Sequence, residues 1–207
     1  MRRDVTGEPP AATGPDRLAR WVTELFAPQV LVIAMPPLAG LLAQGWTGAA
    51  WGLLASALCG GVPAAVIAMG VRAGRLDSRH LVDRAGRTKP LLAAAGAVLA
   101  ALVLLIVLGA PTLLVATVAA MLGALAVTVP VTLRWKISFH AAVSGGTVVV
   151  FAQVLPPPPT LAAGAVLLAL VCWARVRLGH HTTAQVLAGL VVGVAVTAAT
   201  LAAFGEL

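Results

Sequence analysis

Seven long apolar runs, separated by short connections, constrain this chain more than any other feature. They cover residues 27–44, 48–71, 91–109, 112–133, 139–154, 160–174 and 184–204. A helix needs about 20 apolar residues to cross a bilayer, so each run is long enough to cross it or nearly so. With 60% hydrophobic and 10% charged residues, the composition excludes a soluble globular domain and a disordered nucleic-acid-binding protein. The sequence therefore predicts an all-α fold, a polytopic membrane bundle of six to seven transmembrane helices.

The segment before the first run predicts a tail followed by a surface helix. Residues 1–15 are polar and rich in Gly and Pro, and they lack the apolar core of a signal peptide, so we expect a flexible tail. From Asp16 onward the apolar residues recur at helical spacing, namely Leu18, Trp21, Val22, Leu25 and Phe26. This pattern predicts an amphipathic helix that lies in the membrane interface. We expect residues 16–207 to form a single membrane-embedded domain.

Several residues inside or between the apolar runs predict local structure. Gly60, Gly61 and Pro63 should bend or thin the second span. The four prolines at 156–159 should form a stiff extended turn between the fifth and sixth spans. Cys59 and Cys172 lie within apolar runs, where a thiol packs as a small hydrophobic group, so neither suggests a disulfide or a metal site.

The charged residues are sorted between alternate connections. The N-terminal segment and the connections near 72–90, 134–140 and 175–183 contain all 14 Lys and Arg and all four His, and the other set contains none. The positive-inside rule accounts for Arg2, Arg3, Arg17 and Arg20 and would place this surface in the cytoplasm. It does not account for four histidines, which carry little charge at neutral pH. We therefore expect a functional site at the basic surface.

Three short segments at this surface carry the chemistry. They are LDSRHLVDRAGRTKP (76–90), WKISFH (135–140) and ARVRLGHHTTAQ (174–185), and each lies just before an apolar run. Helix N-termini offer free N–H groups and a positive dipole end, so three of them beside Arg and Lys predict an anion site, most plausibly for phosphate. His181 precedes Gln185 by four positions, which predicts that both side chains share one helical face. Thr182 and Thr183 are candidates to cap that helix.

The pattern Arg175-x5-His181 resembles the third motif of the type 2 phosphatidic acid phosphatase superfamily, Ser-Arg-x5-His-x3-Asp. Members of that superfamily are membrane enzymes that hydrolyse lipid phosphates through a phosphohistidine without a metal. Ala174 replaces the Ser of the motif, and Gln185 replaces its Asp. Because Gln lacks the negative charge of Asp, we expect it to fix the tautomer of His181 less firmly.

The other two motifs of the family are matched in the right order. In the second motif, Pro-Ser-Gly-His, Ser138 and His140 match, and Phe139 stands in place of Gly. The first motif, Lys-x6-Arg-Pro, is the loosest, because Lys89 precedes Pro90 where Arg is expected. Arg84 and Arg87 are expected to supply its charges.

The resemblance implies a role for each matched residue. His181 would attack phosphorus, His140 would protonate the departing lipid oxygen, and Gln185 would hold the ring of His181. The phosphoryl oxygens would be bound by Arg84, Arg87, Lys89, Lys136, Arg175 and the backbone around Ser138 and Phe139. No metal or other cofactor is implied. The expected partner is a lipid phosphate of the prenyl phosphate or phosphatidate type among membrane lipids, with no nucleic acid.

Four further polar residues lie in or near the same segments, and two other functions are alternatives to hydrolysis. Asp77, His80, Asp83 and His180 are candidates to support the site from its margin, and the two aspartates most simply pair with nearby arginines. A prenyltransferase or terpene cyclase of the UbiA type is one alternative, but it needs two aspartate-rich clusters for Mg²⁺, and only two acidic residues lie between Glu24 and Glu206. A non-catalytic protein that binds or transports anionic lipids is the other.

Overall fold

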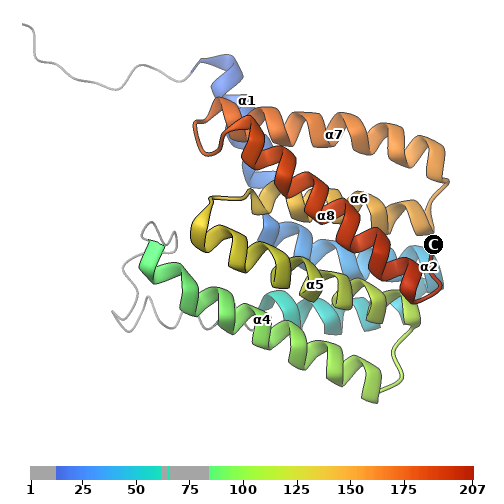
Figure 1. The fold of residues 1–207 in the computed structure, drawn as a ribbon. Coiled ribbons are helices and arrows are strands. Elements are labelled where there is room, and N and C mark those ends of the chain that lie inside the picture. Colours follow the sequence, from blue (N-terminus) through green and yellow to red (C-terminus); the bar gives the residue numbers. More distant parts are fainter. Residues whose placement is uncertain (1–12, 62–64, 66–83) are drawn as a thin grey trace, which may run out of the picture.

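A computed structural model describes residues 13–61, 65 and 84–207, and within them the chain is a bundle of helices (Figure 1). In chain order they are α1 (Gly14–Leu25), α2 (Pro28–Ser56), the π-helical segment η1 (Ala57–Gly61), α4 (Arg84–Val107), α5 (Thr112–Arg134), α6 (Phe139–Val154), α7 (Pro157–Arg177) and α8 (Thr183–Ala203). Within the described residues, four helical stretches are long and apolar enough to cross a membrane, and Leu91–Val107 and Phe139–Val154 are shorter apolar helices. The prediction of an all-α membrane bundle is confirmed.

Helix α2 is a hairpin of two arms. The helical backbone breaks at Gln44 and at Gly45, which has a φ of 64°. The chain reverses direction at these two residues. As a result, Gly40 faces the backbone of Gly48, and Gly52 faces that of Pro36. A Cβ atom at Gly40, Gly48 or Gly52 would overlap the opposite backbone, so only Gly permits this approach. The two arms correspond to the first two apolar runs, and the second ends in η1, where the sequence predicts a bend.

A hydrogen bond between the two arms compensates for a proline inside the first. Pro37 has no N–H group, so the carbonyl of Ile33, four residues earlier, loses its usual helical donor. The hydroxyl of Ser56 donates to that carbonyl at 2.7 Å. The proline is therefore tolerated in mid-helix because the opposite arm supplies the missing donor.

The prediction of an extended turn over the four prolines is wrong for three of them. Only Pro156 lies outside a helix, and residues 157–159 form the first turn of α7. The N–H groups of a first turn have no acceptor within the helix, so the absence of an N–H group there breaks no hydrogen bond. The prolines start the sixth span instead of separating it from the fifth.

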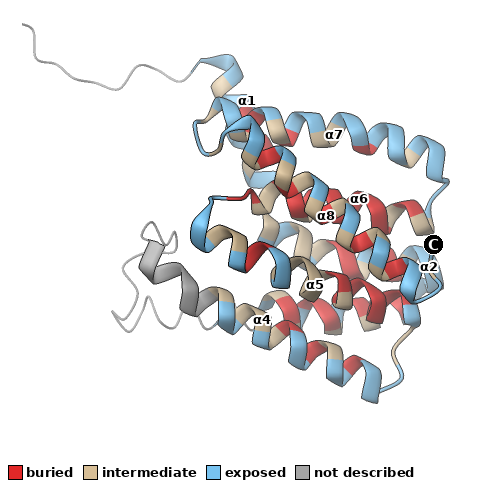
Figure 2. Ribbon diagram, viewed as in Figure 1, coloured by how far each residue is buried: buried red, intermediate tan, exposed pale blue. Residues whose placement is uncertain are grey.

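Helix α6 lies at the centre of the bundle, in contact with α2, α5, α7 and α8. Most of its residues are buried, whereas α7 and the outer faces of α4 and α8 expose large apolar side chains (Figure 2). Gly189 and Gly193 of α8 pack directly on backbone atoms of Ser138 and Ala142. This close approach brings the first turns of α6 and α8 together.

Helix α1 is the predicted amphipathic helix, and it packs against the end of α7. Ala19 and Val22 are buried against Val171 and Ala174. Nε of Arg177 donates to Oδ1 of Asp16 at 2.9 Å. On the outer side, Leu18, Trp21 and Leu25 are 52%, 72% and 61% exposed. These three side chains fit the expected position in the membrane interface.

Candidate active site

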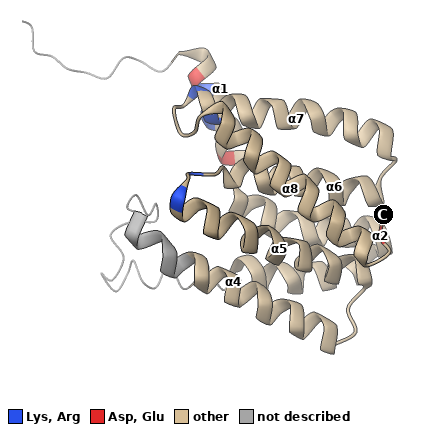
Figure 3. Cartoon of the chain, viewed as in Figure 1, with Lys and Arg blue, Asp and Glu red and all other residues tan. Residues whose placement is uncertain are grey.

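The described cationic residues gather at one end of the bundle (Figure 3). Arg134 ends α5, Lys136 lies in the link to α6, and Arg175 lies in the last turn of α7. Arg17 and Arg20 lie on α1 at the same end. The four-residue link 135–138 and the short loop 178–182 therefore bring the second and third sequence segments to one place.

His181 lies just before α8, where it is held by the cap of that helix. Thr182 is the N-cap residue, and its N–H group donates to Oε1 of Gln185 at 3.1 Å, while the N–H group of Gln185 donates to Oγ1 of Thr182 at 3.4 Å. The same Oε1 atom lies 3.2 Å from Nδ1 of His181. The predicted pairing of His181 with Gln185 is present, but it arises from this capping box. The prediction that His181 and Gln185 share one helical face is wrong, because α8 begins after His181.

The surroundings of Nδ1 determine the tautomer of His181. Besides Oε1 of Gln185, the backbone carbonyl of Lys136 lies 3.3 Å from Nδ1. Both neighbours are hydrogen-bond acceptors, since Oε1 is itself identified by the N–H group of Thr182 that donates to it. Nδ1 therefore carries the hydrogen, and Nε2 presents its lone pair. The carbonyl of Lys136 therefore compensates for the weaker control of the His181 tautomer that is expected when Gln replaces Asp.

The charge of Arg175 lowers the pKa of three histidines. The guanidinium group interacts electrostatically with His140, His180 and His181. The side chain is half-buried, and its Nε atom is buried without a hydrogen-bond partner within the described residues. A buried cationic donor of this kind requires an acceptor, and an anionic oxygen is the strongest one. The geometry at Arg175 therefore suits a bound phosphate or carboxylate.

Helix α1 supplies one wall of this group of residues. The backbone of Thr23 lies beside the ring of His140, and Arg20 acts electrostatically on His180. The positive charge of Lys136 contributes to the lowered pKa of both His180 and His181. Neither Thr23 nor the carbonyl of Lys136 can be recognised from sequence, because a backbone group contributes through its position alone. Arg20 could have been proposed from its charge.

Burial lowers the pKa of His181, and the positive charge of Arg175 lowers it further. The hydrogen bonds to Gln185 and to the Lys136 carbonyl act in the opposite direction, but the net pKa lies below the ordinary value for histidine. Burial and Arg175 likewise lower the pKa of His180. Both rings are therefore neutral at pH 7, which is the form in which an imidazole can act as a nucleophile.

Ser138 and Phe139 do not present their side chains to the site. Ser138 is fully buried, and its Oγ atom accepts the N–H group of Ala141 at 3.4 Å as the N-cap of α6. Its own N–H group donates to the carbonyl of Gln185 at 3.2 Å. The side chain of Phe139 lines an apolar cavity inside the bundle. Ser138 therefore joins α6 to α8, and its N–H group is not free to bind phosphate as expected.

The first sequence segment lies largely beyond the described part of the chain. Asp77, His80 and Asp83 are outside the described residues. Arg84, Arg87 and Lys89 lie in the first turns of α4, so the segment does not precede a helix as expected, and their side chains are not described. Among the described side chains, no group of three or more His, Cys, Asp or Glu residues is placed to hold a metal ion.

Comparison with known proteins identifies the part of the chain that carries this site. Residues 132–207 match the family model of the PAP2 superfamily. The match includes the end of α5, α6, α7 and α8, with His140, Arg175 and His181. Neither a search of curated proteins nor a search of solved structures returned a significant match. Residues 132–207 are therefore similar to the PAP2, or type 2 phosphatidic acid phosphatase, superfamily, and they contain the second and third of the sequence motifs that resemble that family.

Proposed function

We propose that the protein hydrolyses a lipid phosphate or diphosphate through a phosphohistidine intermediate, without a metal ion. The observation that carries this proposal is the setting of His181. Two acceptors hold the hydrogen on Nδ1, so the lone pair of Nε2 is free, and Arg175 places an unpartnered cationic donor nearby. A nucleophile and an oxyanion ligand at one site are the minimum that phosphoryl transfer needs.

In the first step, Nε2 of His181 attacks phosphorus. Arg175 and Lys136 bind the phosphoryl oxygens, and Arg84, Arg87 and Lys89 are candidates to add further positive charge. The bond between phosphorus and the lipid oxygen breaks, and His140 donates a proton to that oxygen, so the lipid alcohol leaves. With a diphosphate, the lipid monophosphate leaves instead. Burial lowers the pKa of His140, and the charge of Arg175 lowers it further, so this step requires that the negatively charged substrate raise that pKa in the complex.

In the second step, water attacks the phosphohistidine. His140, now neutral, accepts a proton from the water as the new oxygen–phosphorus bond forms. The bond between phosphorus and Nε2 breaks, and inorganic phosphate is released. Throughout, Gln185 and the Lys136 carbonyl accept the hydrogen of Nδ1 and so stabilise the charge that the ring acquires.

The membrane setting determines how such a substrate reaches the site. The cationic residues lie at the ends of apolar helices, so a phosphate can bind them while its tail stays within the bundle or the bilayer. The cationic surface is the one that the positive-inside rule assigns to the cytoplasm. We therefore propose a site on the cytoplasmic side for a prenyl phosphate or phosphatidate.

Phosphate release from detergent-purified protein tests the proposal. Prenyl phosphate and phosphatidate should both be offered, in the presence of a chelator, and His181→Ala should lower release by more than about 10³-fold. His180→Ala, at the exposed neighbour, should cause a much smaller loss. Substrate labelled at phosphorus should leave an acid-labile label on the wild type and none on His181→Ala. Turnover by His181→Ala at the wild-type rate would refute the mechanism, and a strict Mg²⁺ requirement would favour the prenyltransferase alternative.

A further inference from the structure

Within the described residues, the end of α1 leaves the carbonyl group of Thr23 without a helical donor. In a continuing helix it would accept the N–H group of Ala27, but that group donates to the carbonyl of Glu24 at 3.3 Å. The N–H group of Phe26 donates to the carbonyl of Val22 at 3.0 Å. A carbonyl in the last turn of a helix therefore needs a donor from another element. Helix α1 thus presents an acceptor and the negative end of its dipole at Thr23.

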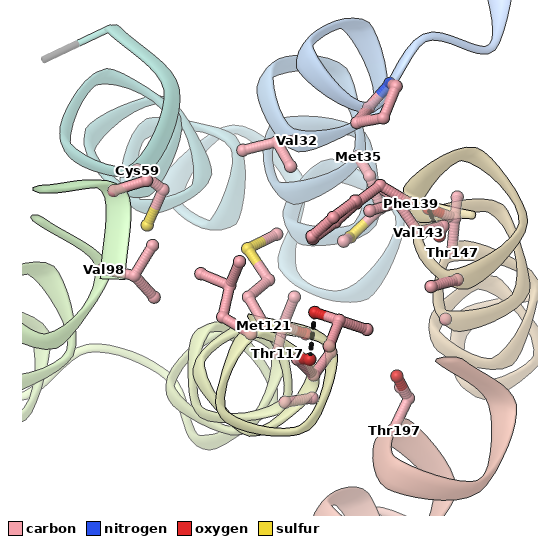
Figure 4. Close-up of a pocket in the computed structure, with 18 of the residues that line it drawn as sticks. Val32, Met35, Cys59, Val98, Thr117, Met121, Phe139, Val143, Thr147 and Thr197 are labelled. Atoms are coloured by element: carbon pink, nitrogen blue, oxygen red, sulfur yellow. Dashed lines mark hydrogen bonds between the residues drawn. The ribbon is translucent and has the colours of Figure 1, made fainter. Parts of the chain in front are cut away.

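The ring of His140 lies at this carbonyl. The backbone of Thr23 raises the pKa of His140, which only an acceptor can do, so the backbone group concerned is the carbonyl. Phe139, the residue before His140, points into an apolar cavity of the bundle (Figure 4). Successive side chains on a helix lie about 100° apart. The first turn of α6 can therefore place Phe139 in the interior and His140 against α1.

Packing on α7 holds α1 in this position. Ala19 is fully buried and Val22 is 8% exposed, and both belong to one apolar cluster with Ala174 of α7. Ala174 directly precedes Arg175, so α1 lies beside the turn that carries the proposed oxyanion ligand. Thr23 follows Val22, and its Oγ1 atom is buried. The free carbonyl therefore belongs to a packed helix and not to an exposed loop.

We propose that Thr23 is a positioning residue for the general acid, because its carbonyl accepts one ring N–H group of His140 and directs the other ring nitrogen toward the substrate. The inference rests on the proposed function. It assigns part of the site to α1, which lies outside the residues 132–207 that match the family model.

The same acceptor would serve both steps of the reaction. In the first step, the protonated ring of His140 keeps one hydrogen at Thr23 and gives the other to the lipid oxygen as the phosphorus–oxygen bond breaks. The neutral ring still holds its remaining hydrogen at Thr23. Its bare nitrogen therefore faces the water molecule that attacks the phosphohistidine, and it accepts a proton from that water.

The end of α1 also opposes the groups that disfavour a charged ring. Burial lowers the pKa of His140, and the charges of Arg175 on α7 and of His181 and His180 before α8 lower it further. The carbonyl of Thr23 acts in the opposite direction, and the negative end of the α1 dipole adds to its effect. Helix α1 therefore favours the protonated form of the ring that the first step requires.

Moving α1 tests the proposal through the leaving group. Ala19→Leu adds bulk between α1 and α7 and should displace Thr23, whereas Ala165→Leu makes the same change at an exposed position of α7. The alkoxide of phosphatidate needs a proton to leave, but 4-nitrophenolate does not. Because a displacement of about 1 Å can cost about 100-fold, kcat/KM of Ala19→Leu for phosphatidate should fall at least about tenfold.

The second substrate and the control variant decide the outcome. For 4-nitrophenyl phosphate, kcat/KM of Ala19→Leu should fall by less than about threefold, because its leaving group needs no acid. Ala165→Leu should match the wild type with both substrates. An equal fall with both substrates in folded Ala19→Leu, or no fall with either, would overturn the proposal.

Weakening the carbonyl itself tests the proposal without moving α1. An α-hydroxy acid with the same side chain, in place of Glu24, turns the bond between Thr23 and Glu24 into an ester, whose carbonyl is a weaker acceptor. The same replacement at exposed Trp21 also removes one helical N–H group but leaves the carbonyl of Thr23 an amide. The first protein should show a kcat/KM for phosphatidate about threefold or more below that of the second, and equal values for 4-nitrophenyl phosphate. Equal values with phosphatidate would exclude the role of this carbonyl.

The state of the ring separates this inference from the proposed function. With nitrogen-15-labelled histidine, nuclear magnetic resonance distinguishes a neutral ring held as one tautomer from a ring that exchanges between two. His140, assigned by the loss of its signal in His140→Gln, should be a single tautomer in the wild type and in Ala165→Leu, and a mixture in Ala19→Leu. This result would support the role of α1 even if no phosphate ester were hydrolysed. Two tautomers in the wild type would overturn it, even if the enzyme proved active.

Discussion

The N–H group of Ser138 donates to the backbone carbonyl of Gln185 at 3.2 Å. This bond joins the N-cap of α6 to the first turn of α8. His140 follows Ser138 by two residues, and His181 precedes Gln185 by four, so one hydrogen bond ties together the two segments that carry the proposed acid and nucleophile. The positions of both rings therefore depend on how closely α6 and α8 approach.

Gly189 permits that approach, and Gly189→Ala should disturb it. A Cβ atom at this position would overlap the carbonyl oxygen of Ser138, which is backbone and cannot rotate away. We expect a loss of about 1–3 kcal/mol in stability, together with reduced activity. Thermal unfolding in detergent measures the first effect and phosphate release the second. Gly96→Ala, where nothing lies within 4 Å, is the control and should be neutral or slightly stabilising.

The pH dependence of hydrolysis should reflect the lowered pKa of His181. The nucleophile must be neutral, and burial together with Arg175 keeps its pKa below the ordinary value of about 6.5. Activity should therefore persist as the pH falls through 6.5 and decline only at a lower pH. The dependence of kcat/KM on pH, with a tail-less substrate, measures this. A decline centred above about 6.5 would contradict the assignment.

Gln185→Glu should move the same profile in the opposite direction. Glu has the same length as Gln, so its carboxylate can still accept from Nδ1 of His181 and adds a negative charge about 3 Å away. The pKa of His181 should rise, and the acidic decline should shift to higher pH. Gln185→Leu leaves only the Lys136 carbonyl to hold Nδ1, and it should lower kcat by about 10- to 100-fold. A profile unchanged in Gln185→Glu would mean that His181 does not govern it.

The ion pair between Asp16 and Arg177 should hold α1 on α7. A hydrogen bond from the Thr13 hydroxyl lowers the pKa of Asp16, and Arg177 adds to this effect. The carboxylate contact is thus present at neutral pH and is lost as the pH falls through that lowered pKa. Asp16→Asn should increase the mobility of a spin label placed at exposed Leu18. Glu206→Gln, at the other end of the described chain, should leave the label unchanged.

The sequence predicts the helices of this fold better than their local geometry. Hydropathy locates α5, α6 and α8 to within a residue or two at each end, because long apolar helices are determined by composition. The first turn of α7 is missed, since a rule about prolines in mid-helix does not hold where N–H groups lack acceptors. The role of the α8 capping box in positioning His181 is also not predicted, although its Thr-x-x-Gln pattern is present in the sequence.

The candidate site is predictable in its side chains and not in its backbone groups. His181, Gln185 and Arg175 can be chosen from residue type and spacing, and the structure brings them together. The second acceptor for Nδ1 is the carbonyl of Lys136, which lies 45 positions before His181 in the sequence. A carbonyl is present at every position, so only the tertiary fold identifies the one that matters. The buried position of Ser138 has the same origin, because its residue type alone suits both a phosphate ligand and a helix cap.

The reversal at Gln44 and Gly45 has a practical consequence for measuring orientation. By folding the first apolar stretch into two arms, it leaves α1 and the last turn of α8 at opposite ends of the bundle. A reporter enzyme that is active in only one compartment, fused after Leu207, should therefore lie on the side of the bilayer opposite to the histidines. The fusion point is far from every residue of the proposed active site. If the arginines of α1 lie in the cytoplasm, that reporter should be active only outside it.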